Sequence, residues 1–364
     1  MSQRAILAGR RRPPSPWLAP AVSALGYDVV ATVIADRPED GRYYLSPGAL
    51  ERVELALERT DGSMVVVDGR VHVGQLADLQ ERLVDAAVHD RRSVVWAWLG
   101  ASNPVADTRL ALRNARLERR LAERAGDRDR SPAGTGSRVA DLDRQCDRLR
   151  DRFEDRQQAE RVRIESAHTD ADGYVVMVDE IGTLSRVHSG VVLGEEERTA
   201  TRPTRAETTV VPIGTHRIAV TDGPAIPWTA AIPEWFEPVV PGAIAALERA
   251  DLVCSSTGDL ATHLAGRFDA DQVVLSVADG RDVLRAALAD RFTSVVLEAS
   301  FPATDSAHTA VSWLYDRGDV TSISYGDRID LSVTVPERAV DGIERRVREA
   351  DGRLERVAVP EGDR

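Results

Sequence analysis

The sequence predicts an α/β protein, and three features of its residue pattern support this class. Short apolar runs alternate with helical segments over residues 5–100, as they do where a sheet is built from repeated βα units. The same alternation returns after Gly173. Between the two stretches, from about Val105 to Glu165, leucines lie among arginines and glutamates without a strand pattern, which favours long helices.

The first segment, residues 1–104, is predicted to be an N-terminal α/β domain with a small, largely parallel sheet. Apolar runs predict strands over 5–9, 29–34, 64–68 and 94–99, and helices are predicted over 20–25, 47–57 and 73–83.

The second segment, residues 105–167, is predicted to be a helical hairpin. Two long charged helices flank a glycine-rich turn at 131–136, which contains Gly134 and Gly136. A solvated coiled-coil arm accounts for this pattern, and contact of individual arginines with a ligand is the alternative.

The third and fourth segments, residues 168–292 and 293–364, return to strands and helices. In the third, strands are predicted over 175–178, 208–213, 217–221, 252–255 and 273–275, with helices over 241–249 and 282–290. The fourth is a small C-terminal α/β domain, with strands over 294–299, 320–325 and 329–335, a helix over 308–317, and a closing helix from Pro336 ahead of a frayed end.

The charge balance restricts the partners of the protein. The chain of 364 residues has a formal net charge of -12, and its 47 basic residues are all arginine because it contains no lysine. An acidic excess of this kind suits a halophilic cytoplasm, where salt screens self-repulsion, and it argues against blanket affinity for nucleic acid. A local arginine patch that binds RNA stays open, because guanidinium suits phosphate and base stacking.

The sequence favours a cytoplasmic protein without membrane contact. Its two cysteines, Cys146 and Cys254, lie in different segments and are expected to be reduced. No run of about eighteen uncharged apolar residues occurs, and the residues after Met1 lead straight into a strand-like run instead of a signal peptide.

Two other kinds of chemistry are not favoured. Ser306 and His308 beside Asp305 are triad residue types, but near neighbours on one loop do not adopt triad geometry, so helix capping is predicted there. The seven histidines show no metal-ligand spacing, so no metal site is expected.

Five short segments occur in the order found in one known family. They are YYLSPGAL at 43–50, VVD at 66–68 with QLADLQERL at 75–83, HDR at 89–91, GTG at 134–136 ahead of DLDR at 141–144, and LYDRGDV at 314–320. Their order is specific, spans nearly the whole chain, and resembles the HflX family of ribosome-associated GTPases. The resemblance implies an N-terminal domain that enters the large ribosomal subunit, a helical arm, a Ras-like G domain of the P-loop NTPase type, and a small C-terminal α/β domain. It also implies GTP-dependent work on ribosomes.

A phosphate loop is expected after the strand at 175–178, where an apolar run leads into a polar turn. Such a loop needs glycines to admit the phosphates, a lysine to bridge them and a hydroxyl for Mg²⁺. The corresponding positions hold Asp179, Leu184, Ser185 and Arg186, and Gly182 lies between them. A carboxylate where an anion should bind is repulsive by roughly several kcal/mol at close range.

Two further nucleotide motifs are only partly kept. Asp222 matches the aspartate of the metal-linked Asp-x-x-Gly motif, but Ala225 replaces its glycine. Thr204 ends a stretch, 199–204, that resembles the switch sequence of the family.

The guanine-reading motif is missing. Asn-Lys-x-Asp cannot exist without lysine, and the chain after Cys254 is short, as though the strand and loop of that motif had been deleted. Ser276 and Ala278 still resemble the last base-contacting loop. A degenerate P-loop NTPase-like α/β domain is therefore predicted, without GTP hydrolysis and without a cofactor. The alternative is a GTPase that binds GTP and Mg²⁺ through an atypical phosphate loop, in which Arg186 replaces the lysine.

Function is therefore expected in the first two segments. By resemblance, the partner is the rRNA of the large ribosomal subunit, with an intact paralogue as a further partner. The candidate contact residues are Arg10, Arg11, Arg12, Gly134, Gly136, Arg138 and Arg144. A solvated face balanced by carboxylates is the alternative for the arginines, and a stand-alone interaction scaffold is the alternative for the whole chain.

Overall fold

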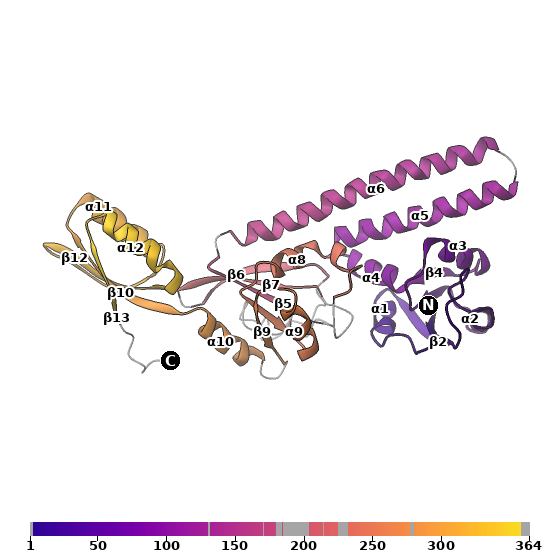
Figure 1. Ribbon diagram of the computed structural model, residues 1–364, viewed down its shortest axis with the longest axis horizontal. Helices are drawn as coiled ribbons and strands as arrows, with labels where there is room; N and C mark the ends of the chain where they lie inside the picture. The colour runs from indigo at the N-terminus through magenta and orange to yellow at the C-terminus, as the bar shows by residue number, and fades with distance from the viewer. Residues whose placement is uncertain are drawn as a thin grey trace. The chain divides into compact units, whose positions relative to one another are not determined.

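The protein is described by a computed structural model, which covers residues 3–129, 132–169, 171–179, 184, 204–213, 215–224, 232–276 and 280–357. Helices and three sheets make up these residues, so the predicted α/β class is confirmed (Figure 1). Two compact units divide the chain. The first takes in residues 1–163, 202–206 and 223–245, and the second takes in 164–201, 207–222 and 246–364. The division into four segments stays a prediction.

The first sheet has four parallel strands in the order β2-β1-β3-β4. Its strands are β1 (Gln3–Arg10), β2 (Tyr27–Ala35), β3 (Met64–Val67) and β4 (Ala87–Asp90), and its helices are α1 (Leu18–Ala24), α2 (Pro47–Thr60), α3 (Val73–Arg82) and α4 (Arg91–Gly100). Every residue of β3 is buried, because helices cover both faces of the sheet. Leu50 of α2 and Leu79 of α3 belong to one core, and Val22 of α1 and Val94 of α4 belong to the other.

The strand predicted over 94–99 is wrong, because these residues lie inside α4. Asp90 starts this helix. Its Oδ1 accepts a hydrogen bond from the backbone N–H of Ser93 (3.0 Å), and Ser93 Oγ accepts one from the N–H of Asp90 (3.0 Å). This reciprocal cap satisfies amide groups at the helix start and at the residue before it. The fourth strand of the sheet is β4, which ends at the cap.

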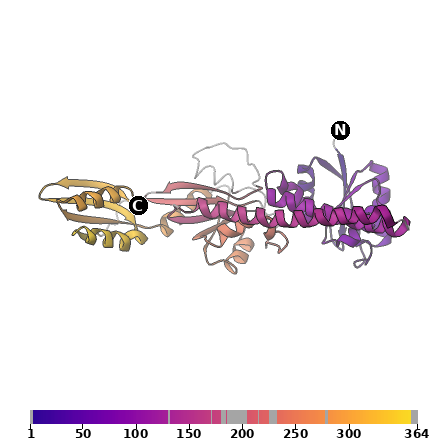
Figure 2. The same cartoon turned by 90° about the horizontal axis from the view of Figure 1, so that it is seen from above.

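The predicted helical hairpin is formed by α5 (Pro104–Asp129) and α6 (Pro132–Ala167), which run antiparallel (Figure 1). Seen from above, α6 is one unbroken helix (Figure 2). Leu112 and Ala115 of α5 pack against Cys146 of α6. The first unit also contains η2 (Glu237–Val239) and the start of α8 (Pro241–Leu247).

The predicted glycine turn of the hairpin is wrong. Gly134 and Gly136 both lie in the first turns of α6, and residues 130 and 131 between the helices lie outside the described chain. Pro132 begins the helix, where the fixed φ of proline suits the first helical position. A Cβ added at Gly136 would meet no atom within 4 Å, so the structure does not require glycine there.

The central sheet has five strands in the order β6-β7-β5-β8-β9. They are β5 (Gly173–Val178), β6 (Glu207–Ile213), β7 (His216–Asp222), β8 (Leu252–Ser255) and β9 (Asp271–Val274), and the helices α9 (Gly258–Ala265) and α10 (Gly280–Arg291) accompany them. All neighbours are parallel except β6, which is antiparallel to β7. Met177 of β5, Ile218 of β7 and Leu288 of α10 belong to its core. The helix α9, which the sequence did not predict, is capped by Thr257, whose Oγ1 accepts from the N–H of Leu260 (3.4 Å).

The C-terminal sheet is antiparallel in the order β11-β12-β10-β13. Its elements are β10 (Ser294–Pro302), α11 (Asp305–Tyr315), β11 (Asp319–Tyr325), β12 (Arg328–Pro336), η3 (Glu337–Ala339), α12 (Val340–Glu349) and β13 (Arg353–Val357). Both helices pack on one face of the sheet, where Phe301 and Val333 meet Ile343 of α12. The residue that caps α11 is Thr304, and β13 follows the last helix as a strand that the sequence did not predict. The last residues, 358–364, which were expected to be frayed, lie outside the described residues.

None of the described helices is both long and apolar enough to cross a membrane.

Candidate functional site

Two predicted nucleotide residues lie at the carboxyl edge of the central sheet. Asp179 follows β5, and Asp222 ends β7, where it is in register with Met177 of β5. Parallel sheets bind their ligands at this edge. Gly182, Ser185 and Ala278 lie outside the described residues.

The carboxylate of Asp179 is hydrogen-bonded to a backbone N–H that lies further along the chain. Its side chain is buried, with 3% of its surface exposed, and its Oδ2 accepts a hydrogen bond from the backbone N–H of Leu184 (2.6 Å). In a phosphate loop, backbone N–H groups of this kind point to the phosphates. The carboxylate of Asp179 therefore already binds one backbone donor, and its charge repels a second anion.

No described strand lies between β8 and β9 in the central sheet. β9 pairs directly with β8, from Leu252 opposite Asp271 to Ser255 opposite Val274. Residues 256–270, all of them described, form α9 and turns. Ser276 follows β9, and its carbonyl oxygen accepts from the N–H of Gly280 at the start of α10 (2.9 Å). Residues 277–279 of the stretch that resembles the last base-contacting loop lie outside the described residues, and the described chain between β8 and β9 carries no further strand.

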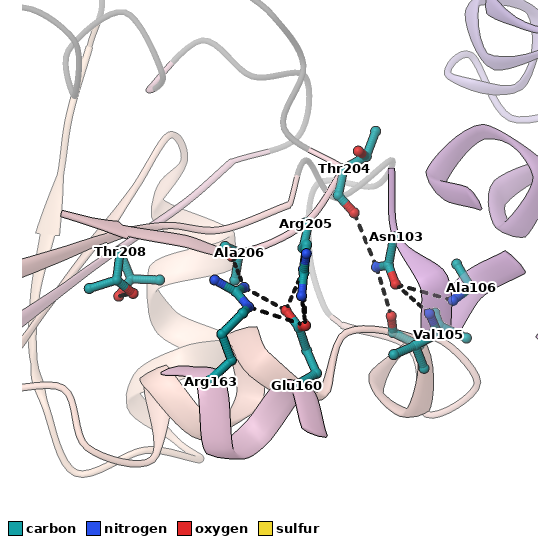
Figure 3. Close-up of polar contacts among 11 residues, drawn as sticks. Asn103, Val105, Ala106, Glu160, Arg163, Thr204, Arg205, Ala206 and Thr208 are labelled. Carbon is teal, nitrogen blue, oxygen red and sulfur yellow. Dashed lines mark hydrogen bonds and ion pairs between the residues drawn. The ribbon is translucent and has the colours of Figure 1, made fainter. Parts of the chain in front are cut away.

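Asn103 is hydrogen-bonded to the start of α5, to Thr204 and to Val239 (Figure 3). It is 3% exposed and precedes α5, and its Oδ1 caps that helix by accepting from the N–H groups of Val105 (3.0 Å) and Ala106 (3.2 Å). Its Nδ2 donates to the carbonyl oxygens of Thr204 (3.1 Å) and Val239 (3.0 Å). One side chain therefore joins three parts of the chain that are far apart in sequence.

Glu160 of α6 makes the neighbouring connection (Figure 3). It is 5% exposed and accepts from Arg163 (2.6 Å) and from Nε of Arg205 (2.9 Å), while Arg163 also donates to the carbonyl oxygen of Ala206. Burial alone would raise the pKa of Glu160, but hydrogen bonds from Arg205 and Arg163, with their charges, lower it below its ordinary value. We call Asn103, Glu160, Arg163 and Arg205 the hairpin clasp.

Thr204 belongs to the segment that the hairpin clasp holds. Its hydroxyl is hydrogen-bonded to the hydroxyl of Ser102, in addition to the bond from Asn103 to its carbonyl oxygen. Its assignment as a nucleotide-binding remnant in a switch-like stretch stays a prediction. Within the first unit, its hydroxyl and its carbonyl oxygen bond residues at the start of the hairpin.

Of the predicted contact residues, Arg10 ends β1, and Arg11 and Arg12 follow it at the carboxyl edge of the first sheet. The strand order reverses between β1 and β3, which is where doubly wound sheets bind ligands. Arg10 pairs with Glu39 (3.4 Å), whereas Arg11 turns the chain in the left-handed region with a φ of 61°.

Asp68 holds this loop in place. It is 7% exposed, and its Oδ2 accepts from the N–H (2.7 Å) and the Oγ (3.0 Å) of Ser15. Its Oδ1 lies 3.2 Å from Nε of Arg91, so the buried carboxylate has a charged partner.

Four exposed arginines follow three strands at this edge. They are Arg11 and Arg12 after β1, Arg37 after β2 and Arg70 after β3, and we call them the edge arginines. None of them forms an ion pair with a described residue. On the hairpin, by contrast, Arg138 pairs with Glu118 (3.6 Å) and Arg144 pairs with Asp141. The edge of the first sheet therefore offers cations that no described carboxylate neutralises.

A known family model matches part of the first domain. Residues 18–97 match the family model described as GTP-binding GTPase N-terminal. This match runs from the start of α1 into α4, so the first domain is of the type found at the N-terminus of GTP-binding GTPases. No curated protein matches the chain.

Solved structures similar to the chain include GTP-binding proteins. One is SsGBP in complex with GDP, at 14% identity over 70% of this chain and 71% of that chain, with a TM-score of 0.39. Another is a GTP-binding protein from the archaeon Sulfolobus solfataricus in complex with GDP, at 11% identity, 71% and 72% coverage, and a TM-score of 0.37. An FpvC mutant from Pseudomonas aeruginosa is similar at 13% identity, 79% and 99% coverage, and a TM-score of 0.22. Scores of this size do not establish a shared arrangement of the whole chain.

Proposed function

We propose that this chain is an HflX-like ribosome-associated protein whose central α/β domain does not hydrolyse GTP. It binds rRNA of the large ribosomal subunit through the first domain and the hairpin, and the central domain serves as a structural module. The observation that carries the proposal is the hydrogen bond from the Leu184 N–H to the buried carboxylate of Asp179.

The chemistry of phosphoryl transfer supports the loss of hydrolysis. Nearly all of that catalysis comes from positioned donors and Mg²⁺ around the phosphates, and the chain has no lysine to supply one of them. A negative charge at the first glycine position opposes the same ligand. The direct pairing of β8 with β9 adds to this, because no described strand carries a guanine-reading loop between them.

The edge arginines support the choice of RNA. Cations at a ligand-binding edge are suited to phosphate groups, and guanidinium can form two parallel hydrogen bonds with one phosphate. The net charge of -12 keeps the rest of the surface from binding nucleic acid without discrimination. A local patch is therefore the part of the surface that can select an RNA partner.

A GTPase with an atypical phosphate loop is the second candidate, and the position of Asp222 favours it. This residue ends β7 in register with β5, where the metal-linked aspartate of a G domain is expected. GTP and Mg²⁺ would then bind at the carboxyl edge of the central sheet, and an intact paralogue would not be needed.

A nucleotide titration separates the two candidates. The full chain, titrated with a fluorescent GTP analogue and Mg²⁺ at high salt, is expected to show no saturable binding at micromolar concentrations, because Asp179 occupies the loop amide. Binding by the wild type that disappears in Asp222→Ala would favour the GTPase. Asp290→Ala serves as the matched control, because Asp290 is exposed at the end of α10.

Ribosome co-sedimentation tests the edge arginines. Arg11→Gln combined with Arg12→Gln is expected to weaken binding of the full chain to large subunits. Each arginine removed should lower the slope of log affinity against log salt by roughly 0.7–0.9, because each phosphate contact releases counterions. The control is Arg345→Gln with Arg353→Gln, two exposed arginines of the C-terminal domain with the same loss of charge. Equal binding by both double variants would contradict the proposal.

The full chain is the right material for this test. A fragment ending near Ala167 would keep Asn103 but remove Thr204 and Val239, whose carbonyl oxygens accept from it. Such a fragment would leave a buried amide without acceptors, so its failure to bind would not report on the arginines.

A further inference from the structure

Three arginines on one face of α5 lie beside α4 without a carboxylate partner. Arg109, Arg113 and Arg116 are spaced four and three residues apart, so they project from the same side of the helix. Each is partly buried, and none forms an ion pair with a described residue. We call these three arginines, with Trp96 of α4, the arginine seam.

Trp96 contacts the arginine seam through Arg109. The guanidinium of Arg109 lies 5.4 Å from the centroid of the Trp96 ring and 5.2 Å from that of Phe153. Trp96 is 4% exposed, and its Nε1 has no hydrogen-bond acceptor among the described residues. A buried indole N–H normally has a partner, so this donor is open to an additional acceptor.

Asp90 does not neutralise the charge of the arginine seam. Its charge acts on Arg113, but its carboxylate already accepts from Arg92 (2.8 Å) and caps α4 through Ser93. Burial lowers the pKa of Arg109, and the charges of Arg116 and Arg92 lower it further. Burial also lowers the pKa of Arg113, against the opposite influence of Asp90. The folded protein therefore holds like charges together at a cost in free energy.

We propose that the arginine seam binds a ligand with two or more linked phosphate groups. The three guanidinium groups extend over roughly 10 Å of α5, given the helical rise per residue, which is enough for more than one phosphate. The guanidinium of Arg109 lies over two aromatic rings, and stacking of this kind leaves N–H groups available for bidentate bonds to phosphate oxygens. Arg113 already donates to the side-chain oxygen of Asn114 (3.1 Å) and to the carbonyl oxygen of Val88 (3.4 Å), so it offers a phosphate its charge and its remaining N–H groups. The open indole N–H of Trp96 adds a neutral donor at the same place.

The arginine seam shares no residue with the edge arginines or with the central sheet. The linked phosphates could belong to a free polyphosphate or to the backbone of an RNA, and the recognition chemistry is shared. If the RNA is ribosomal, the seam extends the surface in the proposed function; if the ligand is a free polyphosphate, the seam is independent of that function.

The test compares two probes on the full chain at fixed ionic strength. Inorganic pyrophosphate is titrated by calorimetry, and a labelled RNA duplex is titrated by fluorescence anisotropy. Arg116→Gln is the main variant, because Arg116 makes no ion pair or ring contact with the residues that the structure describes. The control is Arg150→Gln on α6, an exposed arginine that pairs with Asp147 (2.7 Å).

Arg116→Gln is expected to weaken binding about tenfold, since one charge-assisted hydrogen bond is lost, and adding Arg109→Gln should weaken it further. The thermal midpoint without ligand should stay the same or rise, because repulsion is relieved. Loss of pyrophosphate binding supports a free polyphosphate ligand, and loss of RNA binding alone supports a nucleic acid. The proposal is overturned if both variants bind both probes as the wild type does, or if the wild type binds neither.

Discussion

Replacing Glu160 by alanine is expected to lower the free energy of unfolding of the first unit by about 3–5 kcal/mol, the cost of breaking a buried ion pair on one side. Arg163 and Arg205 would lose the carboxylate that they share. Chemical denaturation followed by tryptophan fluorescence measures this change. The control is Glu154→Ala on the same helix, where an exposed glutamate should cost less than about 0.5 kcal/mol.

The contribution of Glu160 to the free energy of unfolding should decrease as the pH falls into the acid range. Its pKa is lower in the folded protein than in the unfolded chain, so its contribution is fully present above the unfolded value of about 4.3. The contribution is lost as the pH falls through the folded value. The difference in stability between the wild type and Glu160→Gln should therefore be constant near neutral pH and shrink in acid. A difference that grows in acid would show that Glu160 is not held as a carboxylate.

Replacing Asn103 by alanine is expected to cost about 3 kcal/mol. Loss of the helix cap contributes roughly 1 kcal/mol, and the carbonyl oxygens of Thr204 and Val239 lose a buried donor, at about 1 kcal/mol or more each. The same denaturation experiment measures it. Asn114→Ala is the matched control, since Asn114 lies exposed on α5 and, among the described residues, accepts from its neighbour Arg113 (3.1 Å) alone.

Asn103→Asp sharpens the test of the hairpin clasp. Aspartate keeps the oxygen that caps α5 but loses the donor to both carbonyl oxygens and adds a buried charge. It should therefore be at least as destabilising as alanine. If Asn103→Asp is as stable as the wild type, the cap is the whole contribution of Asn103 and the long-range bonds add nothing.

Most strands and helices could be predicted from the sequence because local patterns determine them. The strand predicted over Val94–Leu99 was wrong, because a continuous apolar stretch of this length fits a buried strand or a buried helix equally well. The deciding signal was the reciprocal cap of Asp90 and Ser93, three residues apart. The turn predicted at Gly134 and Gly136 was wrong for a related reason. Glycine permits a turn without requiring one, and here both residues lie in α6.

The polar site was less predictable because its partners are far apart in the chain. The position of Asn103 before Pro104 and a helical pattern signals a cap, but nothing local indicates that its amide donates to Thr204 or Val239, 101 and 136 residues away. Glu160 and Arg205 are likewise one pair among many charged residues. The anion supplied by Asp179 could be anticipated, because its partner, Leu184, is five residues further along.

The direct pairing of β8 with β9 sets a limit on engineering. Point substitutions can exchange Asp179 for glycine or place a lysine in the loop after it, but they cannot create a strand where two others already share their hydrogen bonds. A guanine-selective version of this protein would need an inserted segment of strand and loop that separates β8 from β9 and pairs with both. Point substitutions alone are therefore not expected to make this chain selective for guanine, whereas an inserted strand and loop could.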